Sequence, residues 1–402
     1  MKVKFIIIGI TDEAQPQLSN EVVEIISRGR VFSGGKRHHE IMKPYLPEEN
    51  EWIDITVPLE RVFNDYRRHF EDRPDEAIVV VASGDPLFFG FANTVKRELP
   101  DAEISLYPSF NSLQTLAHRL VMPYHDMRIV SLTGRDWHEF DRALIEHAEK
   151  LGVLTDRVHT PSVIAKRMLE YGYDKYVISV GEHLGNRSEE KVSTMTLEEA
   201  AQTEFSHPNC LILKAEEKLP PRRLGLPDSE FELLNGRDKM ITKMSIRLLS
   251  LQALELYSRQ VLWDIGFCTG SVSIEARLQF PHLLIESFEI REEGRSLIGI
   301  NTHRFGAPGI SSHIGDFLKE DISALPKPDA VFIGGHGGKL IEIFQKVAPL
   351  LEKGGIIVMN SVTAESKQLF HEACRLCKLK EKEPLRIAVN DYHPIEIMKA
   401  VK

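Results

Sequence analysis

The sequence predicts an α/β protein in which helices cover parallel β-sheets. Short apolar runs rich in Val and Ile recur along the chain, each bounded by Gly, Pro or Asp, as is typical of strands buried on both faces. Stretches with helical periodicity separate these runs, so strands and helices alternate. One charged stretch with three prolines and no periodicity, at residues 216–231, interrupts the alternation and predicts an exposed linker.

The expected elements follow in chain order. Strands of the first half begin at Lys4, Ala77, Arg128, Lys175 and Cys210, and those of the second half begin at Val261, Leu283, Ile310, Asp329 and Gly354. A helix is expected over residues 19–28, with Ser19 as its N-cap. Residues 385–401 read as two strands separated by a break.

The linker divides the chain into two expected domains, residues 1–217 and 231–402, joined by residues 218–230. The alternation of strands and helices restarts near Tyr124. The first domain is therefore expected to consist of two α/β subdomains, at about residues 1–123 and 124–217.

The composition excludes several classes of protein. With 402 residues, 42% of them hydrophobic and 27% charged, the chain has an ordinary globular composition. Its net charge of −9 argues against non-specific nucleic-acid binding and requires a local basic cluster for any anionic substrate. No apolar run approaches the roughly 20 residues that span a bilayer. Four cysteines imply no disulfides and fit a reducing cytoplasm.

Cys374 and Cys377 form a C-x-x-C motif, which raises the question of metal or redox chemistry. The motif lies in a helical pattern whose i, i+3 spacing turns both thiols toward one apolar face. No second C-x-x-C completes a zinc site. We therefore expect these cysteines to pack in the core, and we expect no metal site.

The segment VLWDIGFCTGSVSIEA predicts a nucleoside site in the second half. A strand ends at Asp264, a turn runs from Gly266 to Gly270, and a helix follows. Glycines let a ligand approach the backbone at a helix N-terminus. The next strand ends in Glu289, which is suited to accept hydrogen bonds from ribose hydroxyls.

Two cofactor classes compete for this site, a nicotinamide dinucleotide and the methyl donor S-adenosylmethionine. The dinucleotide fingerprint is G-x-G-x-x-G, whereas this turn reads G-x-C-x-G. An acid before the first glycine suits the cationic amino group of the methyl donor. Gly315 and Asp316, after the next strand, fit an adenine contact, and Gly334 ends the strand beside which a substrate would bind. These features favour the methyl donor.

The second half resembles the decarboxylating precorrin methyltransferases of cobalamin biosynthesis. The resemblance covers nearly the whole half and rests on GLPDSEF from Gly225, ITK from Ile241, LWDIGFCTGSVSIEA and PDAVFIGGHGG. It implies methylation of carbon 15 of the macrocycle and loss of carbon dioxide from an acetate. His336, in GGHGG, is the candidate acid, base or carboxylate ligand. Cys268 stands where many members have glycine.

The first half resembles the tetrapyrrole methylase family, in particular its carbon-5 methyltransferases. The resemblance rests on VVVASGDPLFFGFANTV, YPSFNSLQ, SLTGR, HTPSVIAKRMLEYG and VGEHLGNRSEE. It implies a methyl-donor site in a cleft between two subdomains, and it assigns that site to Gly84, Asp85, Ser112 and Gly134. After the first strand the family usually has a run of glycines. Here the sequence reads GITDEAQPQL and keeps only Gly9, so a reshaped loop is expected beside this site.

GGKRHHE supplies the basic cluster that an acidic protein needs for a substrate rich in carboxylates. Lys36, Arg37 and His38 are the candidate contacts, since Arg can bind a carboxylate through two parallel hydrogen bonds. The alternative is a solvated basic turn.

Together the halves resemble the fused C(5,15)-methyltransferases of the corrin pathway. The resemblance implies S-adenosylmethionine at one site per half, a precorrin substrate, a cytoplasmic location and self-association into a homo-oligomer. Two alternatives stay open. In one, only the second half is catalytic and the first half binds or delivers substrate. In the other, the second half is an NAD-dependent oxidoreductase. The sequence also leaves open whether the substrate carries cobalt.

Overall fold

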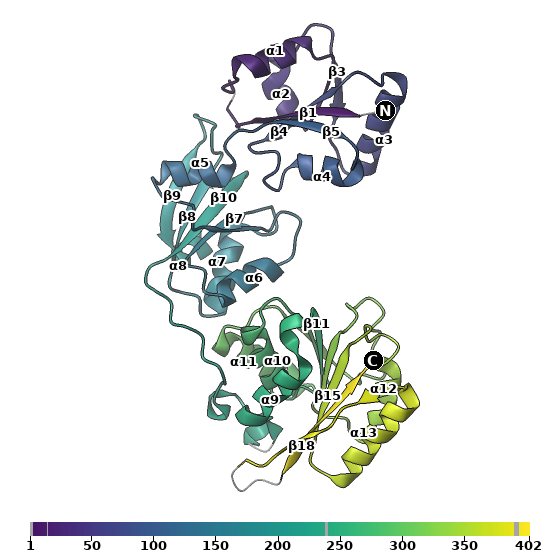
Figure 1. Cartoon of the computed structure of the whole chain (residues 1–402). Helices are drawn as coiled ribbons and strands as arrows, with labels where there is room; N and C mark the ends of the chain where they lie inside the picture. The colour runs from purple at the N-terminus through teal and green to yellow at the C-terminus, as the bar shows by residue number, and fades with distance from the viewer. Residues whose placement is uncertain (1–2, 14, 238–239, 390–393) are drawn as a thin grey trace. The chain divides into compact units, whose positions relative to one another are not determined.

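The computed structural model describes residues 3–13, 15–237, 240–389 and 394–402 (Figure 1). The chain divides into two compact units. The first comprises Met1–Arg135, Glu149–Lys166 and Tyr176–Glu216, and the second comprises Asp136–Ala148, Arg167–Lys175 and Glu217–Lys402. The described strands form three sheets and confirm the α/β fold class.

The first sheet contains five parallel strands in the order β3-β2-β4-β1-β5. Their bounds are Lys4–Ile10 for β1, Val31–Gly34 for β2, Glu51–Asp54 for β3, Ile78–Ser83 for β4 and Glu103–Tyr107 for β5. Since all five run the same way, their carboxyl ends meet at one edge of the sheet, where ligands of open α/β sheets bind.

Helices cover both faces of this sheet (Figure 1). Alternate β1 residues point to opposite faces, so Ile8 packs with α1 and α2 while Ile7 packs with α3 and α4. The helices span Asn20–Arg28 for α1, Lys36–Met42 for α2, Leu59–Asp72 for α3 and Phe91–Glu98 for α4. The predicted N-cap of α1 is confirmed, because Ser19 Oγ accepts a hydrogen bond from Val22 N at 3.2 Å.

The second sheet has the order β6-β7-β10-β8-β9, and only its β6–β7 pair is parallel. The strands span Arg128–Ser131, Lys150–Leu154, Tyr176–Glu182, Lys191–Thr196 and Asn209–Ala215, from β6 to β10. The helices α5 to α8 span Ser112–Arg119, His138–Ile145, Pro161–Glu170 and Leu197–Ala201. The expectation of a parallel sheet is wrong here. The turn between β8 and β9 is too short for a crossover helix, so β9 returns antiparallel.

The third sheet has the order β13-β12-β11-β14-β15-β18-β16, with β17 paired to β18. From β11 to β18 the strands span Val261–Ile265, Leu284–Glu289, Ile310–Ile314, Ala330–Ile333, Ile356–Ser361, Lys380–Glu381, Leu385–Ile387 and Ile395–Val401. The pairs from β13 to β15 are parallel, whereas β18 runs antiparallel to β15. The two expected closing strands are therefore confirmed as β17 and β18. The expected break between them includes residues 390–393, which lie outside the described residues.

Helices also cover both faces of the third sheet. Apolar residues of α9 and α10 pack on one face, and those of α12 and α13 pack on the other. The five helices α9 to α13 span Met244–Leu254, Ser271–Gln279, Glu293–Phe305, Leu340–Val347 and Ala364–Cys377. Short 3-10 turns span Lys43–Tyr45, Asp228–Glu230, Leu234–Gly236 and Leu256–Ser258.

Cys374 lies in the core between α13 and the sheet, and Cys377 packs against that core, as the helical spacing predicted. The parts of the chain that the structure describes contain no group of three His, Cys, Asp or Glu side chains that could hold a metal ion. Within the same ranges no helix has the length and apolar character needed to cross a bilayer.

Part of the expected linker is buried, so the prediction of an exposed segment is wrong for Gly225, Leu226 and Phe231. Leu226 and Phe231 pack against apolar residues of α10. The composition of the segment did not reveal this anchorage, because its polar partners come from distant helices.

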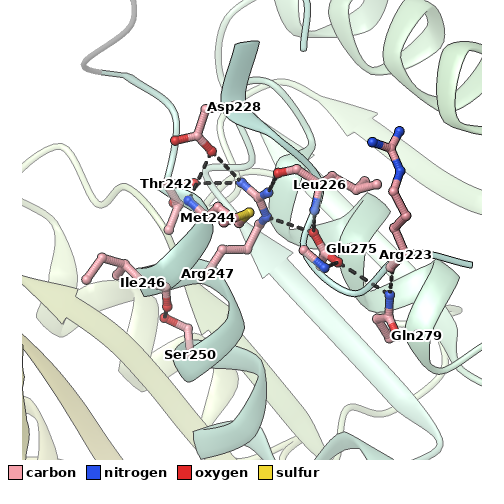
Figure 2. A network of polar contacts seen from close by, with 11 residues as sticks. Arg223, Leu226, Asp228, Thr242, Met244, Ile246, Arg247, Ser250, Glu275 and Gln279 are labelled. Atoms are coloured by element: carbon pink, nitrogen blue, oxygen red, sulfur yellow. Dashed lines mark hydrogen bonds and ion pairs between the residues drawn. The ribbon is translucent and has the colours of Figure 1, made fainter. Parts of the chain in front are cut away.

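Those partners are Arg247 of α9 and Glu275 of α10, both fully buried (Figure 2). Glu275 accepts hydrogen bonds from Gly225 N at 3.0 Å and Leu226 N at 2.9 Å. Arg247 Nε lies 3.2 Å from Glu275 Oε2, and the guanidinium also donates to Leu226 O, Thr242 O and Asp228 Oδ1. This network ties the segment to the helix that follows the expected methyl-donor turn.

Candidate functional site

The turn from Gly266 to Gly270 follows β11 at the carboxyl edge of the third sheet. Its backbone is fixed to β12, since Gly266 N donates to Phe288 O at 2.7 Å and Cys268 N donates to Glu289 Oε2 at 2.8 Å. Gly270, at φ +75°, is the N-cap of α10. The strand, turn and helix that the sequence predicted are therefore all present.

Gly266 is required by backbone packing. It lies at φ +80°, and a Cβ at this position would lie 2.7 Å from both N and O of Gly335. A Cβ on Gly334 would lie 2.8 Å from Gly266 O. The turns after β11 and β14 thus lie back to back, and neither has space for a side chain.

Asp264 lies at the end of β11 and is fully buried. Its Oδ2 accepts a hydrogen bond from Ser273 Oγ at 2.5 Å, and Ser273 Oγ in turn lies 2.8 Å from Ser287 Oγ. Its Oδ1 is buried without a hydrogen-bond partner among the described residues. Burial raises the pKa of Asp264 to about 7, the hydrogen bond from Ser273 opposes the rise, and the charge of Glu289 adds to it. Among the described residues this carboxyl group therefore has no cationic partner.

Glu289 lies at the end of β12 and is also buried. One carboxylate oxygen accepts from Cys268 N, and the other accepts from Arg291 N at 3.0 Å and Arg291 Nη1 at 3.1 Å. The side chain therefore fixes the backbone of the turn and the residues after β12. Sequence reasoning assigned it to ribose alone and missed this second role.

Asp316 follows β13 and Gly315 at the same edge. Its Oδ1 accepts from Leu318 N at 3.1 Å, and its Oδ2 lies 3.5 Å from Lys339 Nζ. The hydrogen bond from Leu318 N, together with Lys339, outweighs burial and lowers the pKa of Asp316. Asp316 is therefore a carboxylate at neutral pH, with part of its side chain exposed.

His336 lies in the loop between β14 and α12. It precedes the helix, because α12 begins at Leu340. His336 Nδ1 lies 3.2 Å from Gly338 N, which donates to it. Burial lowers the pKa of His336. The imidazole is therefore neutral at pH 7 and carries its proton on Nε2.

Cys268 has a strained backbone, at φ +52°. Cys268→Gly should raise the free energy of unfolding by about 0.5–1 kcal/mol, because glycine adopts the left-handed region without the cost of a Cβ. Denaturant midpoints would measure this. Cys268→Ala keeps the Cβ and should give no gain, so equal effects of the two changes would refute strain as the cause.

Gly84 and Asp85, two candidate residues of the first half, lie at the carboxyl edge of the first sheet. Gly84 follows β4 at φ +60°, and a Cβ there would lie 2.8 Å from Asn111 Cα. Asn111 caps α5, which begins at Ser112. Asp85 Oδ1 accepts a hydrogen bond from Leu87 N at 2.9 Å. The structure therefore brings Gly84, Asp85 and Ser112 together, as the resemblance implied.

Gly134 lies in the second subdomain, after β6. It lies at φ +63°, and its N–H donates to Asp156 Oδ2 at 2.9 Å. Asp156 Oδ1 accepts from Val158 N and His159 N, at 2.8 and 2.6 Å. Burial opposes these hydrogen bonds but does not outweigh them, and the pKa of Asp156 is lowered. Asp156 thus fixes the turn that contains Gly134.

Gly9 keeps its place for a steric reason. A Cβ on Gly9 would lie 1.7 Å from Gly84 O, so no other residue fits where β1 passes the turn after β4. The residues that replace the other expected glycines, Thr11 to Glu13, lie beside the turn after β8. A Cβ on Gly185 in that turn would lie 3.4 Å from Asp12 N.

The predicted basic cluster begins α2 and is not a solvated turn. Arg37 forms an ion pair with Asp12. His38 Nδ1 lies 3.3 Å from Gly35 N, and its Nε2 lies 2.9 Å from Ser83 Oγ. Lys36 is exposed and has no ion-pair partner among the described residues. Burial, with Arg37 nearby, lowers the pKa of His38, so His38 is a neutral residue that positions Ser83.

Comparison with known proteins adds independent evidence. Residues 4–201 match the family model of tetrapyrrole (corrin/porphyrin) methylases, and residues 234–401 match that of the precorrin methyltransferase domain. A precorrin-6Y C(5,15)-methyltransferase (decarboxylating) of Sinorhizobium sp. is 32% identical over 367 residues, which cover 89% of this chain and 84% of the relative.

The chain belongs to the precorrin-6Y C(5,15)-methyltransferase (decarboxylating) family.

Two further matches involve part of the chain. A cobalt-precorrin-6B C(15)-methyltransferase (decarboxylating) of Salmonella typhimurium is 37% identical over 133 residues, which cover 33% of this chain and 68% of the relative. A solved structure of a precorrin-6Y C5,15-methyltransferase from Geobacter metallireducens is 31% identical, covers 44% of this chain and 97% of that chain, and has a TM-score of 0.40.

Membership of the precorrin-6Y C(5,15)-methyltransferase family makes the chain an enzyme of the methyltransferase class. It also decides between the two cofactor classes, because the oxidoreductase alternative finds no support in the family.

Two candidate residues escaped sequence reasoning. Ile290, directly after Glu289, is 62% exposed and offers an apolar surface at the edge of the site. Asn301 of α11 is fully buried and donates to Thr269 O at 2.9 Å, which fixes the turn from Gly266 to Gly270. The apolar residues of the run IESFEI could have indicated Ile290, which directly follows β12. Nothing in the sequence around Asn301 distinguished it from a surface polar residue.

Proposed function

We propose that the chain transfers two methyl groups from S-adenosylmethionine to carbons 5 and 15 of a precorrin of the precorrin-6B type, and releases carbon dioxide from the ring C acetate. The product would be precorrin-8X, in cobalamin biosynthesis. The names of the relatives support the two positions and the decarboxylation. The shorter C(15) relatives support assignment of carbon 15 to the second half and carbon 5 to the first.

One observation carries the proposal for the second half. Asp264 Oδ1 is buried, unpartnered among the described residues, and lies beside the turn from Gly266 to Gly270. A buried carboxylate without a partner is costly, and a cation beside it removes that cost. S-adenosylmethionine has a cationic amino group and supplies an already activated methyl group. Glu289, Gly315, Asp316 and Gly334 would line the remainder of the same edge.

The protein's task is then to orient the methyl donor and the substrate and to control proton transfer, because the methyl group needs no further activation. Replacement of a ring hydrogen by methyl releases a proton, and loss of carbon dioxide from an acetate consumes one. Neutral His336 carries its proton on Nε2, because Gly338 N donates to Nδ1. This tautomer suits a hydrogen bond to the acetate carboxylate. His336 is therefore proposed to hold that group.

In the first half, Gly84, Asp85, Ser112 and Gly134 would hold a second molecule of methyl donor, while Lys36 and Arg37 would contact substrate carboxylates. Two donor sites and self-association of the chain are both part of this proposal. His38 is left out of the substrate contacts, since both of its ring nitrogens already have partners.

Mass spectrometry of the products from precorrin-6B, with and without cobalt and with excess S-adenosylmethionine, tests the proposal. The wild-type chain should add two methyl groups and lose carbon dioxide. Asp264→Asn lowers donor affinity in the second half, so with donor held near the wild-type dissociation constant it should reduce addition of the carbon-15 methyl and loss of carbon dioxide, and should leave the carbon-5 methyl. Gly84→Ala should leave the other methyl and the decarboxylation, because its Cβ would enter the backbone at Asn111.

Circular dichroism should show that both variants fold. One added methyl from the wild-type chain, unaffected by Gly84→Ala, would show that the first half only binds or delivers the substrate. No added methyl under any condition would refute the proposal as a whole.

A further inference from the structure

Asp12 lies in the segment that replaces the usual glycines after β1, and its carboxylate contacts the guanidinium of Arg37 through Oδ2 and Nη2. Arg37 belongs to the basic start of α2, at the edge where the substrate of the first half would bind. The Asp12 side chain is 20% exposed and that of Arg37 is 44% exposed. The carboxylate is thus largely covered, while the arginine still reaches solvent.

The Asp12 carboxylate is stabilised mainly by its ion pair with Arg37. Burial raises the pKa of Asp12, and Arg37 counters the rise. His183, in the turn after β8, adds a smaller favourable interaction, and Glu189 in the same turn opposes it. Asp12 is held between α2 and that turn, since its backbone N lies 3.4 Å from the position of a Gly185 Cβ. Arg37 is therefore its main cationic partner.

Arg37 is the residue of the cluster best suited to a substrate carboxylate. A guanidinium forms two parallel hydrogen bonds with a carboxylate, whereas Lys36 offers a point charge. His38 already has partners at both ring nitrogens. The Asp12 carboxylate forms with Arg37 the same kind of carboxylate–guanidinium ion pair that a carboxylate side chain of the substrate would form.

We propose that Asp12 is a built-in competitor for Arg37, which a carboxylate of the tetrapyrrole must displace before it binds in the first half. The inference rests on the proposed carbon-5 activity. One carboxylate replaces another, so the number of ion pairs does not change and the gain in affinity is small. A tetrapyrrole without a carboxylate at that position gains nothing and leaves Asp12 in place. Asp12 therefore lowers affinity and sharpens selection for the carboxylate.

The test measures the KM for precorrin-6B in carbon-5 methylation, in full-length chains that all carry Asp264→Asn, at a donor concentration too low to load the weakened second half. Asp12→Asn should lower KM by roughly two- to five-fold, the size of a partly exposed ion pair. Arg37→Ala should raise KM. Adding Asp12→Asn to Arg37→Ala should not change KM further, because the guanidinium for which Asp12 and the substrate compete is then absent.

Glu13→Gln is the matched control, because it removes the same charge from the neighbouring residue, and it should leave KM unchanged. An unchanged or raised KM in Asp12→Asn would overturn the inference, as would an equal fall in the Arg37→Ala background. Carbon-5 methylation would persist in either case. Its complete absence in every chain would instead refute the proposed function and the inference with it.

Discussion

Arg247→Met should lower the free energy of unfolding by about 3–5 kcal/mol, because it leaves the buried carboxylate of Glu275 without its cation. Both side chains are fully buried, and their contact at 3.2 Å lies at the centre of the network in Figure 2. The change also deprives Leu226 O and Thr242 O of their donors. Chemical denaturation followed by circular dichroism would measure the loss.

Arg223→Met is the matched control, since it removes an arginine of the same region whose ion pair with Glu230 is exposed. Its effect should stay within about 1 kcal/mol. The double change Arg247→Met with Glu275→Leu should recover part of the lost stability, because it removes both charges together. Equal losses from the two arginine changes would contradict a special role for the buried pair.

Asp264→Asn should weaken binding of S-adenosylmethionine to the second half by about 10- to 100-fold, the usual value of a hydrogen bond to a charged group. In the wild-type chain the affinity should rise with pH up to about 7 and then level off. The pKa of Asp264 is about 7 without ligand, and a bound cation favours the ionised form. Isothermal titration between pH 5.5 and pH 7 would detect this, since the amino group of the ligand stays protonated there.

Stability should depend on pH in the opposite direction. The folded-state pKa of Asp264, about 7, lies above its ordinary value of 3.8. The contribution of Asp264 is therefore fully present below pH 3.8 and is lost as pH rises to about 7. Relative to the wild-type chain, Asp264→Asn should gain stability over this range. A constant difference between the two chains would show that Asp264 titrates normally and does not await a cation.

The parts of the fold that sequence predicted best are those with strong local signals. Runs such as KFIIIG and VLWDIG are buried on both faces of parallel sheets, and their unbroken apolar pattern predicts a strand without reference to the rest of the chain. β9 was missed because its residues KVSTMT form an edge strand without an apolar run. The antiparallel order of the second sheet depends on turn length, which the apolar pattern does not encode.

In the candidate site, too, residues with a local sequence signal could be predicted, and residues placed by long-range contacts could not. Asp264, Gly266, Gly270, Glu289 and Asp316 could be named as candidates because each ends or follows a recognisable strand. The partners that fix them could not. Asn301 contacts the turn at Thr269, Arg247 pairs with Glu275 of another helix, and the pairing of Asp12 with Arg37 joins a loop to α2. Such contacts arise from packing and leave no local pattern.

The position of β18 has a consequence for synthesis of the chain. This strand follows the other strands of the third sheet in sequence, yet it lies inside that sheet, between β15 and β16. On the ribosome the third sheet must wait for residues 395–401, and until then β15 presents an open edge. The first sheet is complete once residue 107 has emerged. The first half thus matures while the second is still being translated, and the newly made chain depends longest on protection of that edge.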